Sequence, residues 1–432
     1  MFKLKKLTIF TFLALFLMLT PALAFADSGR FFVKTTSGFW KVALGARHVF
    51  DAGFSAELND FQFRFAKIFG LEVEEVDIFN VLPESVMVEE VIEQKASEVA
   101  SDVVSQVPAS SDVGAEVEVK PENNKGNKPD NSDVQRIKPS DQTPWGIEVV
   151  YNNSEIASTS GGFNVNVAVL DTGVNFDHPD LSGVKGTCFD FTSPVKAVKE
   201  GSCGDKNGHG THVAGIVGAN SGADGLGVYG VAPLVSVSAY KVCGNNGFCF
   251  ADDIASALRH AADNGINVVN MSLGSDADSS LISSAVDYAF SKGVLMVSAS
   301  GNDGPFENSI DFPAAYKEVV AVGAINSLIE ITEWSSRGNN LKTEPFVVED
   351  GDIEFALPGE NIESTWKDNG YAILSGTSMA SPFLSGLAAK YWQFDAEDPA
   401  AATREFLHLL ASDIDGVGDD NASGFGLVRV SE

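Results

Sequence analysis

The sequence has 432 residues, of which 44% are hydrophobic and 20% are charged, a composition typical of globular proteins rather than disordered or fibrous ones. Its 59 acidic residues outnumber its 29 basic ones and give a formal net charge of −30, so backbone phosphates would be repelled and nucleic acid is excluded as a partner. The length exceeds that of one average domain, and we expect more than one folding unit.

Residues 1–26 have the pattern of a secretory signal peptide. Lysines at positions 3, 5 and 6 precede an apolar run over residues 7–19, and Ala24-Phe25-Ala26 follows as a cleavage site. An uncleaved membrane anchor is the alternative, but the run is shorter than the about 20 residues that a span needs. We therefore expect a secreted protein with no membrane contact after cleavage.

The next two segments differ sharply in composition. Residues 27–82 contain the alternating runs Phe61-Gln-Phe63-Arg-Phe65 and Val73-Glu-Glu-Val76-Asp-Ile78, which predict half-buried strands in a small α+β unit. Residues 83–140 are rich in Glu, Ser, Asn and Pro and predict an acidic flexible linker, helical near residues 88–104 and open to proteolysis.

Residues 141–432 have the pattern of an α/β domain. Apolar strands are predicted at residues 165–170, 235–242, 267–271, 294–299 and 319–322. Helices are predicted at residues 210–219, 250–264, 281–292 and 382–392. This alternation predicts a mostly parallel sheet with helices on both faces, in which ligands bind beyond the carboxyl ends of the strands.

Four cysteines fall in this domain, an even number in a chain that we expect to be exported. Pairing by proximity joins Cys188 to Cys203 and Cys243 to Cys249, although the sequence alone leaves three connectivities open. A zinc site is the rival explanation, but the cysteines lack the paired short spacing of zinc modules.

Three polar residues in distinctive contexts are candidates for nucleophilic catalysis. Asp171 ends a predicted strand, His209 lies at a glycine-flanked helix start, and Ser378 follows Gly376-Thr377 before an apolar helical stretch. A serine hydroxyl needs a base and a group that orients the base, and these residues supply both. Singly, Asp171 and Ser378 are more simply read as caps. The pair His209 and His212 suggests metal ligands, but a three-residue spacing without a carboxylate or Cys companion is a weak signal for zinc.

The surrounding blocks resemble the three signature blocks of the subtilisin-like serine proteases. These are Val-Leu-Asp171-Thr-Gly, His209-Gly-Thr-His-Val-Ala-Gly and Gly376-Thr-Ser378-Met-Ala-Ser-Pro, in that family's order of Asp, His and Ser. A lipase-type hydrolase has its Ser before both partners. The resemblance covers about residues 141–432 and implies a serine endopeptidase with a subtilisin-like fold that acts through an acyl-enzyme on Ser378.

The resemblance also implies a substrate cleft. In the block Ser298-Ala-Ser-Gly-Asn302-Asp-Gly, the amide of Asn302 is the expected oxyanion donor. Ser272, Leu273 and Gly274 resemble one rim of the cleft, whose backbone pairs with extended substrate, and the segment containing Gly247 resembles the opposite rim. Asp311 falls near the base of the pocket for the residue before the scissile bond. There it favours Lys or Arg, unless it only caps a turn.

Further expectations from the resemblance concern metals and maturation. Gln142 and Asp180 resemble ligands of a structural calcium site that is completed by loop carbonyls of residues 220–228, while the chemistry needs no cofactor. Residues 27–82 correspond in position to the family's propeptides, so we expect an autoprocessed, monomeric zymogen cleaved near Arg136 or Lys138. The alternative is a catalytically inactive subtilisin-like binding protein, which has no need for an intact triad.

Overall fold

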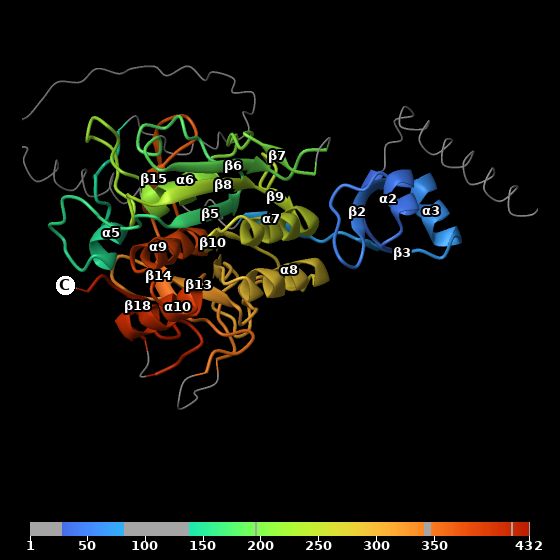
Figure 1. Ribbon diagram of the computed structural model, residues 1–432. Helices are drawn as coiled ribbons and strands as arrows, with labels where there is room; N and C mark the ends of the chain where they lie inside the picture. The colour runs from blue at the N-terminus through green and yellow to red at the C-terminus, as the bar shows by residue number, and fades with distance from the viewer. Residues whose placement is uncertain (1–27, 82–137, 195–196, 341–346, 416–417, 432) are drawn as a thin grey trace, which may run out of the picture.

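The computed structural model describes residues 28–81, 138–194, 197–340, 347–415 and 418–431 (Figure 1). The predicted signal peptide and the linker helix lie outside these residues. A small N-terminal unit (residues 28–81, blue) packs beside a large α/β body (Figure 1). No helix within the described ranges has the length and apolarity that crossing a bilayer requires.

The body is built on an eight-stranded sheet in the order β14-β13-β12-β10-β5-β8-β6-β7. All of its neighbouring strands pair in parallel except β6 and β7. The strands are β5 (Asn166–Asp171), β6 (Lys185–Asp190), β7 (Lys199–Glu200), β8 (Ser236–Lys241), β10 (Val268–Met271), β12 (Leu295–Ala299), β13 (Val319–Ile325) and β14 (Phe355–Pro358). The prediction of a mostly parallel sheet is confirmed.

Helices cover both faces of this sheet, and its central strands are therefore buried on both sides. Helices α6 (His209–Gly218) and α9 (Thr377–Lys390) share one apolar cluster with the sheet, to which α5 (Trp145–Val150) and α10 (Pro399–Leu410) contribute. Helices α7 (Ala251–Asp263) and α8 (Ser280–Ser291) pack on the other face. Short antiparallel pairs complete the body: β15 (Ile362–Thr365) with β16 (Tyr371–Leu374), and β17 (Ala411–Ser412) with β18 (Leu427–Val428).

Helix α9 begins at Thr377, five residues before the predicted start at Pro382. Proline has no N–H to donate to the carbonyl four residues earlier, which here belongs to Ser378. The hydroxyl of Ser272 donates to that carbonyl instead, at 2.8 Å. A side chain from a neighbouring strand end therefore stabilises a helix that sequence rules would end, and Ser378 lies in its first turn.

The N-terminal unit is the predicted small α+β unit, but one of its elements was predicted wrongly. Strands β1 (Ser28–Lys34), β2 (Phe54–Asn59) and β3 (Glu72–Glu75) form an antiparallel sheet beside helices α2 (Gly38–Ala43) and α3 (Asp60–Ile68). The alternating Phe61–Phe65 run lies in α3. A capping box between Asn59 and Gln62 starts this helix.

The unit ends in strand β4 (Ile78–Val81), which leaves its own sheet. Strand β4 pairs antiparallel with β11 (Leu273–Gly274) on one side and with β9 (Phe248–Phe250) on the other. The last strand of the unit is thus part of the body.

The four cysteines form the two disulfides predicted by proximity. Cys188 bonds to Cys203 and Cys243 bonds to Cys249. The second bond closes the loop that carries β9.

Candidate active site

The candidate catalytic residues follow strands or begin helices at the carboxyl edge of the sheet. Asp171 is the last residue of β5, Asn302 follows β12, and Ser272 follows β10. His209 and Ser378 lie in the first turns of α6 and α9, two helices that pack against each other. Parallel neighbours end at one edge, so the topology brings these distant segments to one place.

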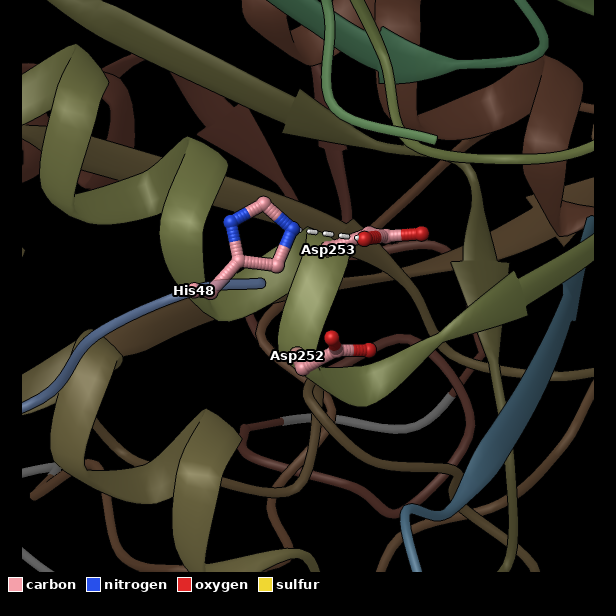
Figure 2. A group of neighbouring side chains, drawn as sticks. All are labelled: His48, Asp252 and Asp253. Atoms are coloured by element: carbon pink, nitrogen blue, oxygen red, sulfur yellow. Dashed lines mark hydrogen bonds and ion pairs between the residues drawn. The ribbon is translucent and has the colours of Figure 1, made fainter. Parts of the chain in front are cut away.

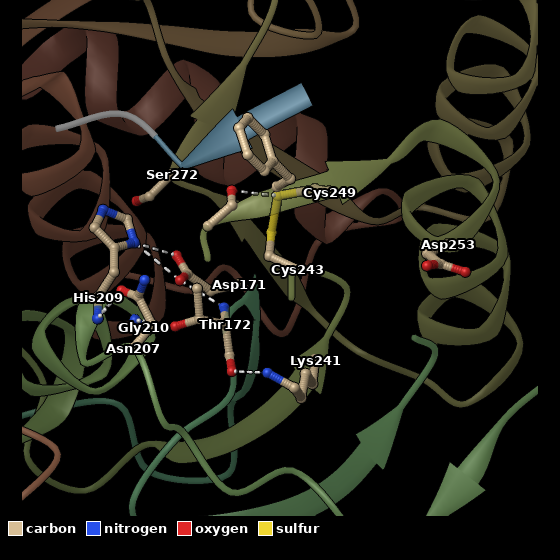
Figure 3. The surroundings of a disulfide bond; sticks show 12 residues. Asp171, Thr172, Asn207, His209, Gly210, Lys241, Cys243, Cys249, Asp253 and Ser272 are labelled. Carbon is tan, nitrogen blue, oxygen red and sulfur yellow. Dashed lines mark hydrogen bonds and ion pairs between the residues drawn. A yellow bond between two sulfur atoms is a disulfide. The ribbon is translucent and has the colours of Figure 1, made fainter. Parts of the chain in front are cut away.

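The ring of His209 points at the carboxylate of Asp171 (Figure 3). Nδ1 of His209 lies 2.9 Å from each carboxylate oxygen, and both side chains are almost completely buried. A carboxylate only accepts hydrogen bonds, so Nδ1 carries the proton. Nε2 is buried and has no hydrogen-bond partner within the described parts of the chain, which leaves its lone pair available as a base.

Glycine makes this close approach possible. A Cβ at Gly210, the residue after His209, would lie 2.1 Å from the carbonyl oxygen of Gly173 and 3.0 Å from Oδ1 of Asp171. A side chain at position 210 would therefore push α6 away from the end of β5. The glycine-flanked histidine of the sequence is explained by this contact.

Ser378 lies in the first turn of α9, where helix N–H groups lack acceptors within the helix. Its hydroxyl donates to the carbonyl of Ser272 at 3.2 Å rather than to Nε2 of His209. A serine hydroxyl changes direction by a single side-chain rotation, and catalytic hydrogen bonds are commonly formed only when substrate is bound. The geometry supplies a hydroxyl at a helix N-terminus that favours developing negative charge.

The side chain of Asn302 is fixed at its oxygen end. Oδ1 accepts from the amide and the hydroxyl of Thr377, each at 3.0 Å. The NH2 end remains as the donor, next to the first turn that carries Ser378. A fixed, uncharged donor in this position suits an oxyanion.

Asp205 is an important residue that the sequence analysis missed. Oδ1 accepts from the amides of Asn207 and Gly208 and from the hydroxyl of Thr172, and Oδ2 accepts from the amide and hydroxyl of Thr211. One carboxylate thus ties the strand end after Asp171 to the loop and first turn around His209. An Asp shortly before a glycine-flanked helix start is a capping signal that could have identified it.

Lys241 also binds the segment that follows Asp171. Its Nζ donates to the carbonyl of Thr172 at 2.5 Å, and burial lowers the pKa of the amine. Lys241 is also paired in register with Asp171 across β8 and β5. Nothing in the motif around Asp171 signalled this lysine.

The predicted substrate rims bracket an extended strand, which is β4 of the same chain. Leu273 pairs with Val81 and Gly274 pairs with Asn80, while the amide of Val81 donates to the carbonyl of Gly247 at 3.0 Å. The structure therefore brings the predicted rim residues together around one peptide. The Cys243–Cys249 disulfide fastens the rim that contains Gly247 (Figure 3).

Asp311 is a buried neighbour of the segment that precedes Asn302, and its amide donates to the carbonyl of Ser300 at 2.8 Å. It is only 3% exposed, and its Oδ2 would lie 2.8 Å from a Cβ at Gly301, the neighbour of Asn302. Carboxylate oxygens of Asp276, Asp303 and Asp311 lie within 4.8 Å of one another. Burial, reinforced by Asp303 and Asp276, raises the pKa of Asp311 to about 8.

The two predicted calcium ligands lie at one loop, residues 220–228. Nε2 of Gln142 lies 2.6 Å from the carbonyl oxygen of Gly225 and 3.2 Å from that of Gly227. Asp180 is 1% exposed and directs Oδ1 at the same loop. A Cβ added at Gly222 would lie 3.0 Å from this oxygen. Rotating the Gln142 amide by 180° would place a third oxygen beside the two carbonyls, so these residues fit an oxygen-preferring cation.

The His209–His212 metal pair is not formed. Nε2 of His212 lies 3.0 Å from the carbonyl of Ile362 and 3.1 Å from that of Ala372, and it donates to both. Burial lowers the pKa of His212 to about 3, so the ring stays neutral. His212 is used to join α6 to the β15–β16 pair.

Residues 162–426 match the model of the subtilase family. The chain is 48% identical over 311 residues to a subtilisin of Bacillus sp. (strain TA39), covering 67% of this chain and 73% of that protein. It is 35% identical over 286 residues to the minor extracellular protease Epr of Bacillus subtilis (strain 168), covering 66% and 41%. Among solved structures, the S41 psychrophilic protease is similar with a TM-score of 0.65 and 49% identity, covering 68% of this chain and 99% of that one.

Proposed function

Because the chain belongs to the subtilase family and is a subtilisin-like serine endopeptidase, we propose that Ser378 is its nucleophile, His209 its general acid and base, and Asp171 the residue that orients His209. The observation that carries this assignment is the buried contact between Nδ1 of His209 and Asp171, at 2.9 Å. Nε2 of His209 has no hydrogen-bond partner among the described residues. The substrates are proteins and peptides.

The proposed reaction follows from this geometry. Oγ of Ser378 attacks the scissile carbonyl carbon as its proton passes to Nε2 of His209, and Asp171 stabilises the imidazolium. The oxyanion accepts from the amide of Ser378 and from the NH2 of Asn302. As the C–N bond breaks, His209 returns the proton to the leaving amine. Water, deprotonated by the same imidazole, then hydrolyses the acyl-enzyme.

The test is labelling by a serine-directed fluorophosphonate together with casein hydrolysis. We expect the wild-type protein to be labelled and active, and Ser378→Ala to lose labelling and about four orders of magnitude or more of kcat. Ser182→Ala, a change at an exposed serine outside the site, is the matched control. Absence of labelling in the wild-type protein would instead support the alternative, a catalytically inactive binding protein.

We further propose that the enzyme is made as a secreted zymogen, with a signal peptide over residues 1–26, a propeptide over 27–82 and a linker over 83–140. The position of β4 between the two rims of the cleft supports this, because a strand of the chain itself occupies the place of substrate. Carboxylate oxygens of Glu363 accept from the amide of Ser140 at 3.0 and 2.9 Å and from its hydroxyl. The body therefore binds the chain from Ser140 onward, which favours cleavage just before it, near Arg136 or Lys138. N-terminal sequencing of secreted protein tests the boundary.

We propose Lys or Arg as the preferred residue before the scissile bond. The support is the place of Asp311 beside Gly301, the neighbour of Asn302, with Asp276 and Asp303 close by. A cationic side chain entering there would offset three neighbouring carboxyl groups. Comparing chromogenic peptides that end in Arg, Leu and Phe tests the preference, and faster hydrolysis of the Leu or Phe peptide would reject it.

We also propose a structural calcium ion held by Gln142, Asp180 and carbonyls of the 220–228 loop. The support is the convergence of oxygen-bearing groups on this loop and the burial of Asp180. Calcium there would stabilise the loop and take no part in the chemistry. We expect the mature enzyme to be monomeric.

A further inference from the structure

A buried pair of carboxylates lies where the N-terminal unit meets the body. Asp252 and Asp253 occupy the first turn of α7 and are 0% and 1% exposed. His48 of the N-terminal unit directs its ring at Asp253, with Nε2 2.8 Å from Oδ1 (Figure 2). Two adjacent buried carboxylates repel each other and need positive partners.

Arg47 binds Asp253 and two backbone carbonyls of the body. One of its terminal nitrogens donates at 2.8 Å both to Oδ1 of Asp253 and to the carbonyl of Phe191. Its other terminal nitrogen donates to the carbonyl of Ser193 at 2.9 Å. The Arg47 side chain is 5% exposed, so this guanidinium is an anchor buried in the body rather than a surface charge.

Arg30 completes the cluster from β1. Its Nη1 lies 2.8 Å from Oδ2 of Asp253 and 3.3 Å from Oδ1 of Asp252, and its guanidinium lies 3.8 Å from the centre of the Phe250 ring. Burial raises the pKa of Asp252. Although burial acts in the same direction on Asp253, His48, Arg30 and Arg47 together hold its pKa below the usual value.

All the ion pairs found for these two carboxylates, among the residues that the structure describes, come from the N-terminal unit. The side chains of His48, Asp252 and Asp253 are also spaced closely enough to hold a metal ion. The guanidinium groups of Arg30 and Arg47 already supply the positive charge, so a dication would meet repulsion. The cluster is therefore better explained as a contact between two units than as a metal site.

We propose that Asp252 and Asp253 form an exosite by which the enzyme holds its own N-terminal unit, selecting a partner that presents two guanidinium groups and an imidazole. The inference rests on the proposed zymogen and adds the residues that recognise its N-terminal unit. Asp253 lies on α7, away from Asp171 and His209 (Figure 3). After the linker is cut, the exosite and β4 keep the unit bound, and the bound unit blocks the cleft. Loss of either contact weakens or abolishes this inhibition of the enzyme by its N-terminal unit.

The experiment follows release of the N-terminal unit from the processed full chain. Gel filtration with mass spectrometry measures retention, and hydrolysis of a chromogenic peptide measures opening of the cleft. We expect Asp253→Asn and Arg47→Gln each to release the unit at least about 10-fold faster, as the loss of a buried charge partner implies. The double variant should release the unit more slowly than the product of the two single effects predicts, because both changes remove the Asp253–Arg47 contact.

Two controls accompany these variants. Lys34→Gln removes a basic residue of the same unit that pairs with exposed Glu72 and Glu74, and it should release at the wild-type rate. Once the unit is gone, Asp253→Asn should show the wild-type kcat/KM on the peptide. Release at the wild-type rate by both charge variants, or fully additive effects, overturns the exosite.

A second route covers variants that do not fold or process themselves. In the Ser378→Ala full chain, a site for a specific external protease is inserted into residues 83–137, and dissociation is measured after cutting. Arg47→Lys keeps the positive charge but loses the planar set of guanidinium donors, so the N-terminal unit of this variant should dissociate at an intermediate rate. Failure of the proposed function is distinguishable, since it appears as a wild-type chain that hydrolyses no peptide, whereas failure of the exosite leaves an active enzyme whose release is insensitive to these charges.

Discussion

Asp205 accepts a hydrogen bond of 3.0 Å from the hydroxyl of Thr172, the residue that follows Asp171. The same carboxylate accepts from the amide of Thr211, two residues after His209. The two partners of the proposed catalytic pair are thus held at their separation by a third residue, which lies outside every signature block.

We predict that Asp205→Ala lowers kcat about 10- to 100-fold with KM changed less than about threefold, because a small displacement of His209 impairs proton transfer more than peptide binding. Asp205→Asn keeps one acceptor oxygen and should recover part of the loss. Steady-state kinetics on matured enzyme, normalised by active-site labelling, checks this.

The control for that prediction is Asp420→Ala. Asp420 caps a remote loop by accepting from the amides of Ala422 and Ser423 and from the Ser423 hydroxyl. If this variant loses as much kcat as Asp205→Ala, or if Asp205→Ala acts only on KM, a positioning role for Asp205 is wrong.

The preference for cationic residues should rise with pH. Asp311 has a pKa raised to about 8, so its negative charge is mostly absent below that pH and present above it. The ionised fraction rises from about 1% at pH 6 to about 90% at pH 9. We expect the ratio of kcat/KM for Arg- over Leu-ending peptides to increase at least about 10-fold over this range. Asp311→Asn should flatten it, and an unchanged ratio in the wild-type enzyme would contradict the role.

Removal of calcium should lower the melting temperature. An ion present at 100 times its Kd adds about 2.7 kcal/mol, equivalent to about 4–5 °C in a domain of about 290 residues. Chelation of the Ser378→Ala protein should show this shift in a thermal melt. Gln142→Leu should melt at the lower temperature and no longer respond to the chelator. Gln393→Leu, which removes a bond to the Tyr391 carbonyl elsewhere, is the matched control and should still respond.

A buried ion cluster near the C-terminus should control acid stability. Glu354 accepts from Nε of Arg404 at 2.8 Å and pairs with Nε2 of His408 at 2.7 Å. Burial acts to raise its pKa, but Arg404 and His408 hold it below the ordinary value of 4.5. A carboxyl with a lowered pKa stabilises the fold above its unfolded pKa, so this contribution is lost as the pH falls below about 4.5.

We therefore expect Glu354→Ala to lower the free energy of unfolding at pH 7 by about 3–5 kcal/mol, since it leaves Arg404 buried without its partner. The double change Glu354→Leu with Arg404→Met should recover most of that loss. Urea unfolding of the Ser378→Ala protein at pH 7 and pH 3 measures both effects. An equal loss at the two pH values would show that packing, not charge, is responsible.

The sequence was sufficient wherever the signal lies in adjacent residues. The apolar strand ending in Asp171 and the glycine-flanked His209 each have local causes, namely side-chain periodicity and the backbone freedom of glycine. The proximity pairing of the cysteines succeeded for the same reason, because short loops close easily. Local pattern failed at Phe61–Phe65, where a capping box overrode alternation.

The tertiary structure alone decided what long-range contacts create. The sequence around Asp253 does not indicate its contact with Arg47, which lies 206 residues away. The sequence around Pro382 does not indicate that Ser272 donates to the Ser378 carbonyl, which the proline leaves without a donor. Burial and pairing of charges depend on which surfaces meet in space, and that is fixed only when the N-terminal unit packs on α7 and its last strand enters the cleft. The sequence thus determined the chemistry of the site, whereas the fold determined what holds it in position and what covers it.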